Sequence, residues 1–121
     1  MTIRVSLGER SYAIHIADSY RKLPDALASL RLPTQGWVIS HRRLLQRHGR
    51  ELMGVLARAG WRMQTLCVPE RESSKSLAMV QRIIRQISRT PRMRVPLLVA
   101  FGGGVVGDLT GFVAAVLRRG V

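Results

Sequence analysis

The first residues of the chain alternate between apolar and polar positions with the period of a β-strand. Apolar residues fall on one side of Ile3–Leu7, and the same alternation recurs over Tyr12–Ile16. The segment between them, Gly8–Ser11, has the composition of a turn. The pattern therefore predicts an N-terminal β-hairpin. It also predicts a short helix over about residues 20–30, which ends before Pro33.

The middle of the chain changes between strand-like and helical periods. Gly36–Ser40 and Arg62–Val68 indicate two strands, and the period of a helix runs between them over Arg42–Ala59. Gly60 stands where a helix-ending glycine is expected. The predicted apolar stripe of this helix consists of Leu44, Leu45, His48, Leu52, Val55, Leu56 and Ala59. We expect His48 to be a structural residue of that stripe.

A further helix is expected over Lys75–Arg89, with Ser73 or Ser74 as its N-cap. Its predicted buried face consists of Leu77, Val80, Ile83, Ile84 and Ile87. The apolar run Pro96–Phe101 is then typical of a strand covered on both faces, and Val105–Leu117 has the length and composition of a helix.

Strands that alternate with helices predict an α/β fold. We expect one Rossmann-like nucleotide-binding domain over residues 1–121, with a largely parallel sheet flanked by helices and the N-terminal hairpin beside it.

The charge of the chain is unbalanced, with 20 lysine and arginine residues against 7 aspartate and glutamate residues. Only Lys22 and Lys75 are lysines, and the arginines are scattered along the whole sequence. The net charge of +13 favours phosphate-bearing ligands. Aromatic residues make up only 5% of the chain, however, and no nucleic-acid-binding motif is present, so we expect no nucleic-acid partner.

Cysteine usage and the N-terminus indicate the compartment. Cys67 is the single cysteine, which excludes an internal disulfide framework and fits a reducing cytosol. Met1–Arg10 has no apolar segment of signal-peptide length. We therefore expect a cytoplasmic protein. The histidines and Cys67 show no metal-ligand spacing, so no metal site is expected within residues 1–121.

The strongest chemical signal is a glycine cluster after the last apolar run. Gly102, Gly104 and Gly107 form the pattern G-x-G-x-x-G between a predicted strand and a predicted helix. Without Cβ atoms, such a turn lets backbone amides approach a pyrophosphate, and the helix dipole favours the anion. A tight turn without a ligand remains the alternative at this point. Asp108 is then either a first-turn helix acid or an acceptor of hydrogen bonds from a ligand.

The stretch Val95–Leu117 also has the length of a membrane span, and it contains the pair Gly107-x-x-x-Gly111. Its flanks are basic, with Arg92, Arg94, Arg118 and Arg119. Adjacent glycines and the central Asp108 oppose this interpretation, because an acid at the bilayer centre costs roughly 2.5–3.5 kcal/mol on insertion scales.

A second candidate segment follows the strand that ends at Val68. Its loop places Glu72 and Lys75 at the carboxyl edge of the sheet, where open α/β sheets bind ligands. Glu72 suits ribose hydroxyls, and Lys75 suits a phosphate or a carboxylate. A local ion pair at a capped helix start is the alternative. His41, at the end of another strand, is in position to line the nucleotide cleft.

Three parts of the chain match motifs of one family. The run Gly102–Ala115, followed by Arg119–Val121, resembles the signature of 3-dehydroquinate synthases. Leu7–Tyr12 resembles the opening hairpin of that family, and Glu72–Leu77 resembles its E-x-x-K-S-L segment. The resemblance extends over the chain in the family's order, and it argues against the membrane and bare-turn interpretations.

The resemblance implies an NAD-dependent lyase of the shikimate pathway, which converts a keto-sugar acid phosphate (DAHP) to 3-dehydroquinate with loss of phosphate. In the family, NAD oxidises a substrate hydroxyl, phosphate is eliminated, the ketone is reduced again and the ring closes by aldol addition. The resemblance also implies a homodimer and a divalent metal, zinc or cobalt, in the full-length enzyme. A related sugar-phosphate cyclase and a non-catalytic nucleotide-binding remnant are the alternatives, and glycerol-dehydrogenase-like enzymes resemble the chain less well.

Roles follow from the resemblance by position. Arg119 corresponds to an arginine that contacts the substrate across a dimer interface. The expected NAD contacts are Glu70, Arg71, Glu72, Ser73, Ser74, Lys75, Gly104, Val105, Val106, Gly107 and Asp108. The family's metal ligands and its catalytic lysine belong to positions beyond residue 121, in a C-terminal helical domain. We therefore expect no catalytic residue within this fragment and no activity of the fragment alone.

The chain departs from the family pattern at three places. Arg71 stands where the family has glycine, and Leu117 stands where it has tyrosine. Near Ser40 and His41 the family often carries an asparagine or an acid on the adenosine side of the cofactor, and neither is present here.

Overall fold

A parallel sheet forms the centre of the computed structural model, which describes residues 1–90 and 96–121. Its strands are β3 (Gln35–Ser40), β4 (Arg62–Cys67) and β5 (Leu97–Phe101), in the order β4-β3-β5. Both pairs of neighbours are parallel, since β3 pairs with β4 on one side and with β5 on the other. The predicted α/β fold with a parallel sheet is confirmed.

The middle strand β3 is the most deeply buried element, and every residue after its first is buried. Gly36 in β3 is required by packing, because a Cβ at this position would run into the backbone of Leu97 on β5. Strand β5 was expected to be covered on both faces. Leu98 packs against the core on one face and Leu97, Val99 and Phe101 pack against the core on the other, so β5 is covered in part on both faces. It is the edge strand among the described residues, and most of its side chains are only half-buried.

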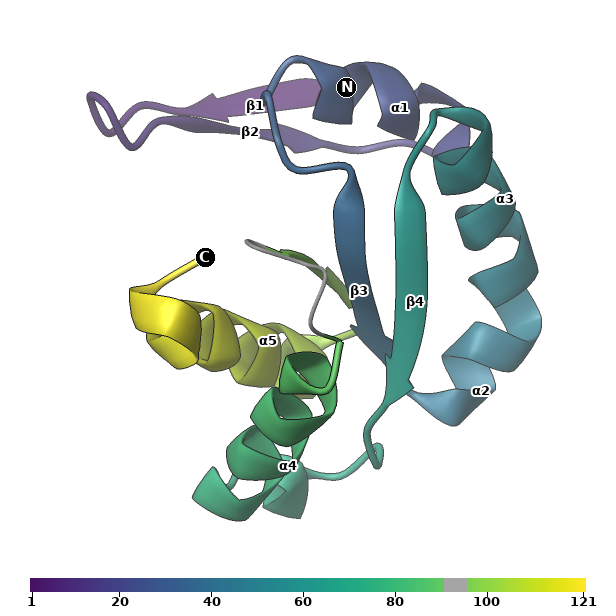
Figure 1. Cartoon of the computed structure of the whole chain (residues 1–121). Helices are drawn as coiled ribbons and strands as arrows, with labels where there is room; N and C mark the ends of the chain where they lie inside the picture. Colours follow the sequence, from purple (N-terminus) through teal and green to yellow (C-terminus); the bar gives the residue numbers. More distant parts are fainter. Residues whose placement is uncertain (91–95) are drawn as a thin grey trace.

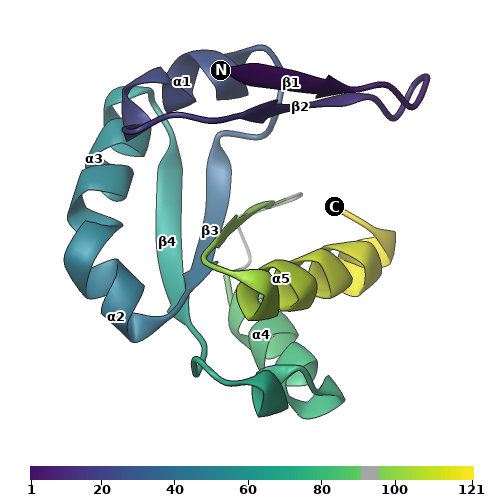
Figure 2. The same cartoon turned by 180° about the vertical axis from the view of Figure 1, so that it is seen from behind.

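Helices cover both faces of the sheet (Figures 1 and 2). One face carries α1 (Leu23–Ala28), α2 (Arg42–Leu44) and α3 (Arg50–Arg58), and the other carries α4 (Leu77–Ser88) and α5 (Gly104–Val116). Three short 3-10 turns flank these helices: Tyr20–Lys22 before α1, Glu72–Ser74 before α4, and Leu117–Arg119 after α5. A π-helical segment, Leu45–Gly49, joins α2 to α3. Each face has its own apolar core: Ile39, Ile83, Val106 and Val113 lie on the α4–α5 side, and Val38, Leu52, Leu56 and Trp61 on the α3 side.

The N-terminal hairpin is confirmed, with β1 (Thr2–Val5) and β2 (Tyr12–His15) paired antiparallel. It projects from one end of the molecule (Figure 1). Gly8 takes a positive φ of 65° in the turn, which suits glycine. The apolar face that the sequence pattern indicated is uncovered, since Ile3 is 45% and Ile14 is 42% exposed.

Two predictions about the helix over residues 42–59 were wrong. His48 and Ala59 are exposed, whereas Gly49 is buried. Both errors are local. His48 and Gly49 lie in the π-helical segment, which inserts an additional residue into a turn, and Ala59 is the C-cap of α3. Leu52, Val55 and Leu56 of the predicted stripe are buried. The helix-ending role of Gly60 is confirmed by its φ of 85°.

The start of α4 also differs from the expectation. Ser76 is the N-cap, and its hydroxyl oxygen accepts a hydrogen bond of 3.2 Å from the Met79 amide, so Ser73 and Ser74 do not cap the helix. Leu77 is therefore the first helical residue, too early to reach the sheet, and it is 76% exposed instead of buried. Val80, Ile83 and Ile87 are buried as predicted, and Ile84 is partly buried.

The stretch considered as a membrane span contains β5, a glycine break and α5. Arg92, Arg94 and Val95, which entered that interpretation, lie outside the described residues. Over residues 1–90 and 96–121, no helix has the length and apolar character needed to cross a bilayer.

Candidate nucleotide site

The carboxyl ends of the three parallel strands meet at one edge of the sheet. In register, Ser40 at the end of β3 lies opposite Cys67 of β4 and Phe101 of β5. The Ser40 hydroxyl donates a 2.5 Å hydrogen bond to the Phe101 carbonyl and ties β3 to β5 at this edge. The chain leaves β3 toward one face of the sheet and leaves β5 toward the other, which creates the crevice where open α/β sheets bind ligands.

The glycine turn after β5 opens α5 at this edge. A Cβ on Gly102 would lie 3.0 Å from the Val106 side chain, so packing explains glycine there. At Gly103, Gly104 and Gly107 an added Cβ would meet nothing within 4 Å, and none of these glycines has a positive φ. The interpretation as a tight turn without a ligand therefore accounts for Gly102 and leaves the other glycines unexplained.

The turn also presents unpaired backbone donors. Gly103 is the N-cap of α5 and no side chain caps the helix. The first intrahelical bond at this end is donated by Gly107 to the Gly103 carbonyl, at 3.0 Å. The amides of residues 104–106 precede it, and amides at this position of a helix have no intrahelical acceptor. An anion at this helix start would accept hydrogen bonds from these amides and gain from the helix dipole.

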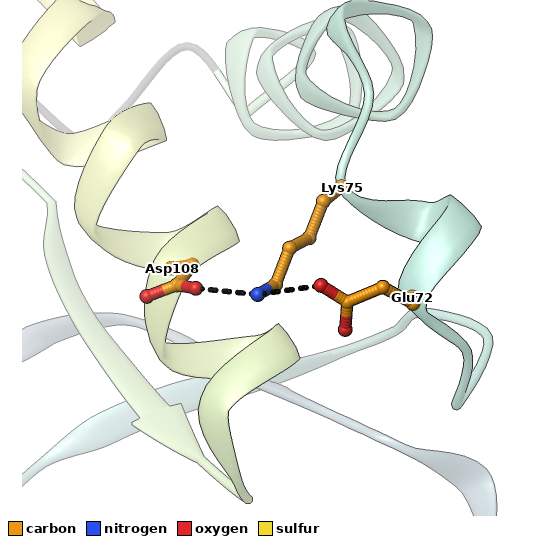
Figure 3. A network of polar contacts seen from close by, with 3 residues as sticks. All are labelled: Glu72, Lys75 and Asp108. Atoms are coloured by element: carbon orange, nitrogen blue, oxygen red, sulfur yellow. Dashed lines mark ion pairs between the residues drawn. The ribbon is translucent and has the colours of Figure 1, made fainter.

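Lys75 stands beside the turn and joins two elements (Figure 3). Its Nζ lies 2.9 Å from Glu72 Oε1 and 2.7 Å from Asp108 Oδ2. The hydrogen bonds with Asp108 and then with Glu72 raise the pKa of Lys75 above its ordinary value, so the ammonium is charged at neutral pH. The local pair with Glu72 was an expected alternative. The contact with Asp108, which brings the loop before α4 to the start of α5, was not predicted.

Asp108 was considered as a first-turn helix acid, and this was wrong. Helix α5 begins at Gly104, so Asp108 lies in the second turn. Its side chain is 66% exposed, which removes the desolvation cost expected for a buried carboxylate.

Several predicted contacts have their side chains engaged within the chain. The Ser74 hydroxyl is buried and donates a 2.9 Å bond to the Pro69 carbonyl, which closes the loop. The Val106 side chain is fully buried against the sheet. These two residues have only backbone groups to offer a ligand. Glu70, Arg71 and Ser73 are exposed on the same loop.

The departures from the family pattern at Arg71 and Leu117 are accommodated. Arg71 has φ −158° and ψ 150°, an extended conformation that any residue adopts, so the absence of glycine causes no strain. Leu117 is 2% exposed and packs in the α4–α5 core.

Two hollows lie near these residues. One, of about 260 Å³, lies between the start of α4 and α5, and it is lined by Lys75, Ser76, Leu77, Val80, Asp108, Leu109 and Phe112. The other, of about 300 Å³, lies beyond the ends of β3 and β4, and it is lined by His41, Arg42, Arg43, Cys67, Val68, Pro69, Glu70 and Arg82. We call the second hollow the arginine pocket. It contains His41, whose expected place in a nucleotide cleft stays a prediction. The arginines of the pocket were missed, although a basic pair directly after a strand end was visible in the sequence.

Arg119 lies far from the glycine turn. It is exposed at the opposite end of α5, which at about 1.5 Å per residue is roughly 20 Å away. Arg119 therefore has no part in a phosphate site at the start of the same helix.

Residues 65–121 match the family model described as 3-dehydroquinate synthase N-terminal. The family resemblance predicted from the sequence is confirmed over this segment. The matched segment, residues 65–121, contains both the Glu72–Lys75 loop and the glycine turn of the 3-dehydroquinate synthase signature.

Solved structures share the fold. A 2-deoxy-scyllo-inosose synthase in complex with carbaglucose-6-phosphate, NAD+ and Co2+ is 18% identical, with a TM-score of 0.80, and the match covers 100% of this chain and 33% of that one. ValA, a 2-epi-5-epi-valiolone synthase from Streptomyces hygroscopicus subsp. jinggangensis 5008 with NAD+ and Zn2+ bound, is 22% identical, with a TM-score of 0.69 and coverage of 92% and 32%. The chain thus spans about a third of the length of these proteins.

Proposed function

We propose that this chain holds the pyrophosphate and ribose of a nicotinamide adenine dinucleotide, as the nucleotide-binding part of a sugar-phosphate cyclase. The observation that carries the proposal is the open space around Gly104 and Gly107. Nothing in the described chain requires glycine at these positions, whereas a phosphate that must approach the backbone does. Lys75, next to the turn, adds a positive charge.

The proposed reaction is that of 3-dehydroquinate synthase, in which DAHP loses phosphate to give 3-dehydroquinate. The family match over residues 65–121 supports it. A related sugar-phosphate cyclase is the second candidate, because the similar structures include an inosose synthase and a valiolone synthase. We also propose a homodimer in which Arg119 contacts the substrate of the partner subunit.

When bound, the dinucleotide supplies a reversible hydride acceptor. The residues of this chain bind and orient it. The amides at the start of α5 donate to the phosphates, and Lys75 places its ammonium beside them. Glu72 is the proposed acceptor for a ribose hydroxyl. Because exposed ion pairs contribute little stability, exchange of a Lys75–carboxylate contact for a phosphate costs little.

Zinc or cobalt belongs to the same proposal for the whole enzyme, since the similar structures are described with Co2+ or Zn2+. Among residues 1–90 and 96–121, no three His, Cys, Asp or Glu side chains gather in a way that could hold a metal ion.

Titration calorimetry of NAD+ with the Gly104→Val variant tests the proposal. A Cβ at this exposed position meets nothing within 4 Å, so circular dichroism should be unchanged. Loss of a charge-assisted hydrogen bond weakens affinity roughly ten- to a hundredfold. Lys75→Ala should lose affinity to a similar degree, and more so at low salt. The control His48→Gln changes an exposed residue outside the site and should bind as wild type does. Equal affinity of Gly104→Val and wild type would show that the turn is not the phosphate site.

A further inference from the structure

Ser40 connects the ends of all three parallel strands. It is the last residue of β3 and is fully buried, so its side chain cannot reach a ligand. Its backbone carbonyl accepts a 2.9 Å hydrogen bond from the amide of Val68, directly after β4. On the other side, its hydroxyl donates the hydrogen bond to the carbonyl of Phe101, the last residue of β5. Ser40 therefore holds the carboxyl edge of the sheet together.

The hydrogen bond to Phe101 acts on the peptide unit that opens the glycine turn. The Phe101 carbonyl and the Gly102 amide belong to one planar peptide unit. A bond that fixes the carbonyl therefore also fixes the direction in which the chain leaves β5. Helix α5 begins two residues after Gly102, at Gly104. The Ser40 hydroxyl thus acts at the start of the turn that presents the amides of residues 104–106.

The glycine turn needs contacts that hold it, because its first two residues are glycines. Gly102 and Gly103 can adopt more backbone conformations than any other residue type. At the helix end, Gly102 packs against Val106, which is fully buried in the core between the sheet, α4 and α5. At the strand end, the Ser40 hydroxyl holds the Phe101 carbonyl. These two contacts restrict the turn from both ends.

This restriction affects ligand affinity. A site whose hydrogen-bond donors are already in place loses less conformational freedom on binding, so it binds more tightly. The donors of the turn are backbone amides, and their directions depend on the backbone alone. Without the Ser40 hydroxyl, the turn loses its contact at the strand end. Helix α5 keeps its place, because Leu109 and Val113 pack in the core.

We propose that Ser40 is a positioning residue for phosphate binding, and that its hydroxyl sets the direction of the amides at the start of α5 through the Phe101 carbonyl. The proposal rests on the proposed function for the identity of the ligand. It goes beyond that function by giving a role to a buried side chain that makes no contact with the dinucleotide.

Three variants in β3 test the proposal by titration calorimetry with NAD+. Ser40→Ala removes the hydroxyl and should weaken binding about tenfold. Ser40→Thr keeps a hydroxyl and should bind within about threefold of wild type. The control Val38→Ala removes buried apolar atoms from the same strand, on the α3 side of the sheet. It should lower the melting temperature more than Ser40→Ala does and keep the wild-type affinity.

Amide spectra of the 15N-labelled chain supply a second test that needs no ligand. The resonances of Gly103 and Gly104 should shift in Ser40→Ala and stay in place in Val38→Ala. Unchanged resonances in Ser40→Ala, or wild-type affinity in this variant, would overturn the proposal. Affinity that falls in step with the melting temperature in both alanine variants would show a purely structural role and overturn it as well. If the wild-type chain binds no NAD+, the proposed function fails, and the spectra alone decide whether Ser40 holds the turn.

Discussion

Alanine at positions 107 and 111 separates the needs of the fold from those of a ligand. Gly107 and Gly111 lie inside α5, one turn apart, and an added Cβ at either would meet nothing within 4 Å. Neither glycine has a positive φ. Glycine inside a helix costs about 0.5–1 kcal/mol relative to alanine. Each substitution should therefore raise the free energy of unfolding by about this amount, and the melting temperature by about 2–6 °C for a chain of this size.

The two variants should differ in nucleotide binding. Gly107 belongs to the proposed phosphate turn, and Gly111 lies one turn further from it. A methyl group at position 107 obstructs a phosphate that approaches the backbone, so Gly107→Ala should weaken dinucleotide binding by roughly tenfold, about 1.4 kcal/mol. Gly111→Ala should bind as wild type does. Thermal unfolding followed by circular dichroism gives the stability, and titration calorimetry gives the affinity.

Each possible failure has a separate meaning. If neither variant is stabilised, the space around α5 is not open and the packing argument is wrong. If both are stabilised and both bind normally, Gly107 is not part of a phosphate site. If Gly111→Ala also loses affinity, the effect travels through the helix rather than through contact, and the assignment of the turn loses its main support.

The remaining predictions concern the core, one ion pair and association. Ile83→Ala leaves a cavity at a fully buried position and should lower the free energy of unfolding by about 2–5 kcal/mol. Leu77→Ala, at an exposed position, should change it by less than about 0.5 kcal/mol. Equal effects of the two substitutions in urea denaturation would contradict the assignment of Ile83 to the buried face of α4. The pKa of Lys75 is raised above its ordinary value of 10.5, so the stability that its ion pairs contribute is fully present below pH 10.5. This contribution is lost as pH rises through the higher pKa of the folded state. The difference in unfolding free energy between wild type and Lys75→Met should therefore be constant near neutral pH and shrink above pH 10.5. Helix α5 exposes two apolar side chains one turn apart, Phe112 (49% exposed) and Val116 (47% exposed). We expect this surface to make the chain self-associate, and Phe112→Ser to associate less. A monomeric wild type in light scattering at tens of micromolar would contradict this.

Periodicity was sufficient for the order and type of the elements, because strands and helices bury one side of the chain at different intervals. Its errors have local causes. The stripe that included His48 assumed a regular helix, and hydrophobic spacing carries no sign of the π-helical segment at Leu45–Gly49. Leu77 was assigned to the core by its helical spacing with Val80 and Ile84. The serines before it offered several possible caps, and only the structure shows that Ser76 is the one used.

The candidate site divides in the same way, between what lies close in the sequence and what the fold brings together. The glycine turn is a local pattern, so its existence and its place before a helix were visible in advance. The contact between Lys75 and Asp108 depends on the crossover from β4 to β5, which carries the chain past β3 and sets the start of α4 beside α5. The arginine pocket depends on the same crossover, since it places Arg82 of α4 near Arg42 and Arg43 after β3. Two clusters separated by tens of residues thus arise from one topological step. A substitution that displaces α4 should therefore disturb both clusters at once, whereas one at Arg43 should leave Lys75 and its carboxylates in place.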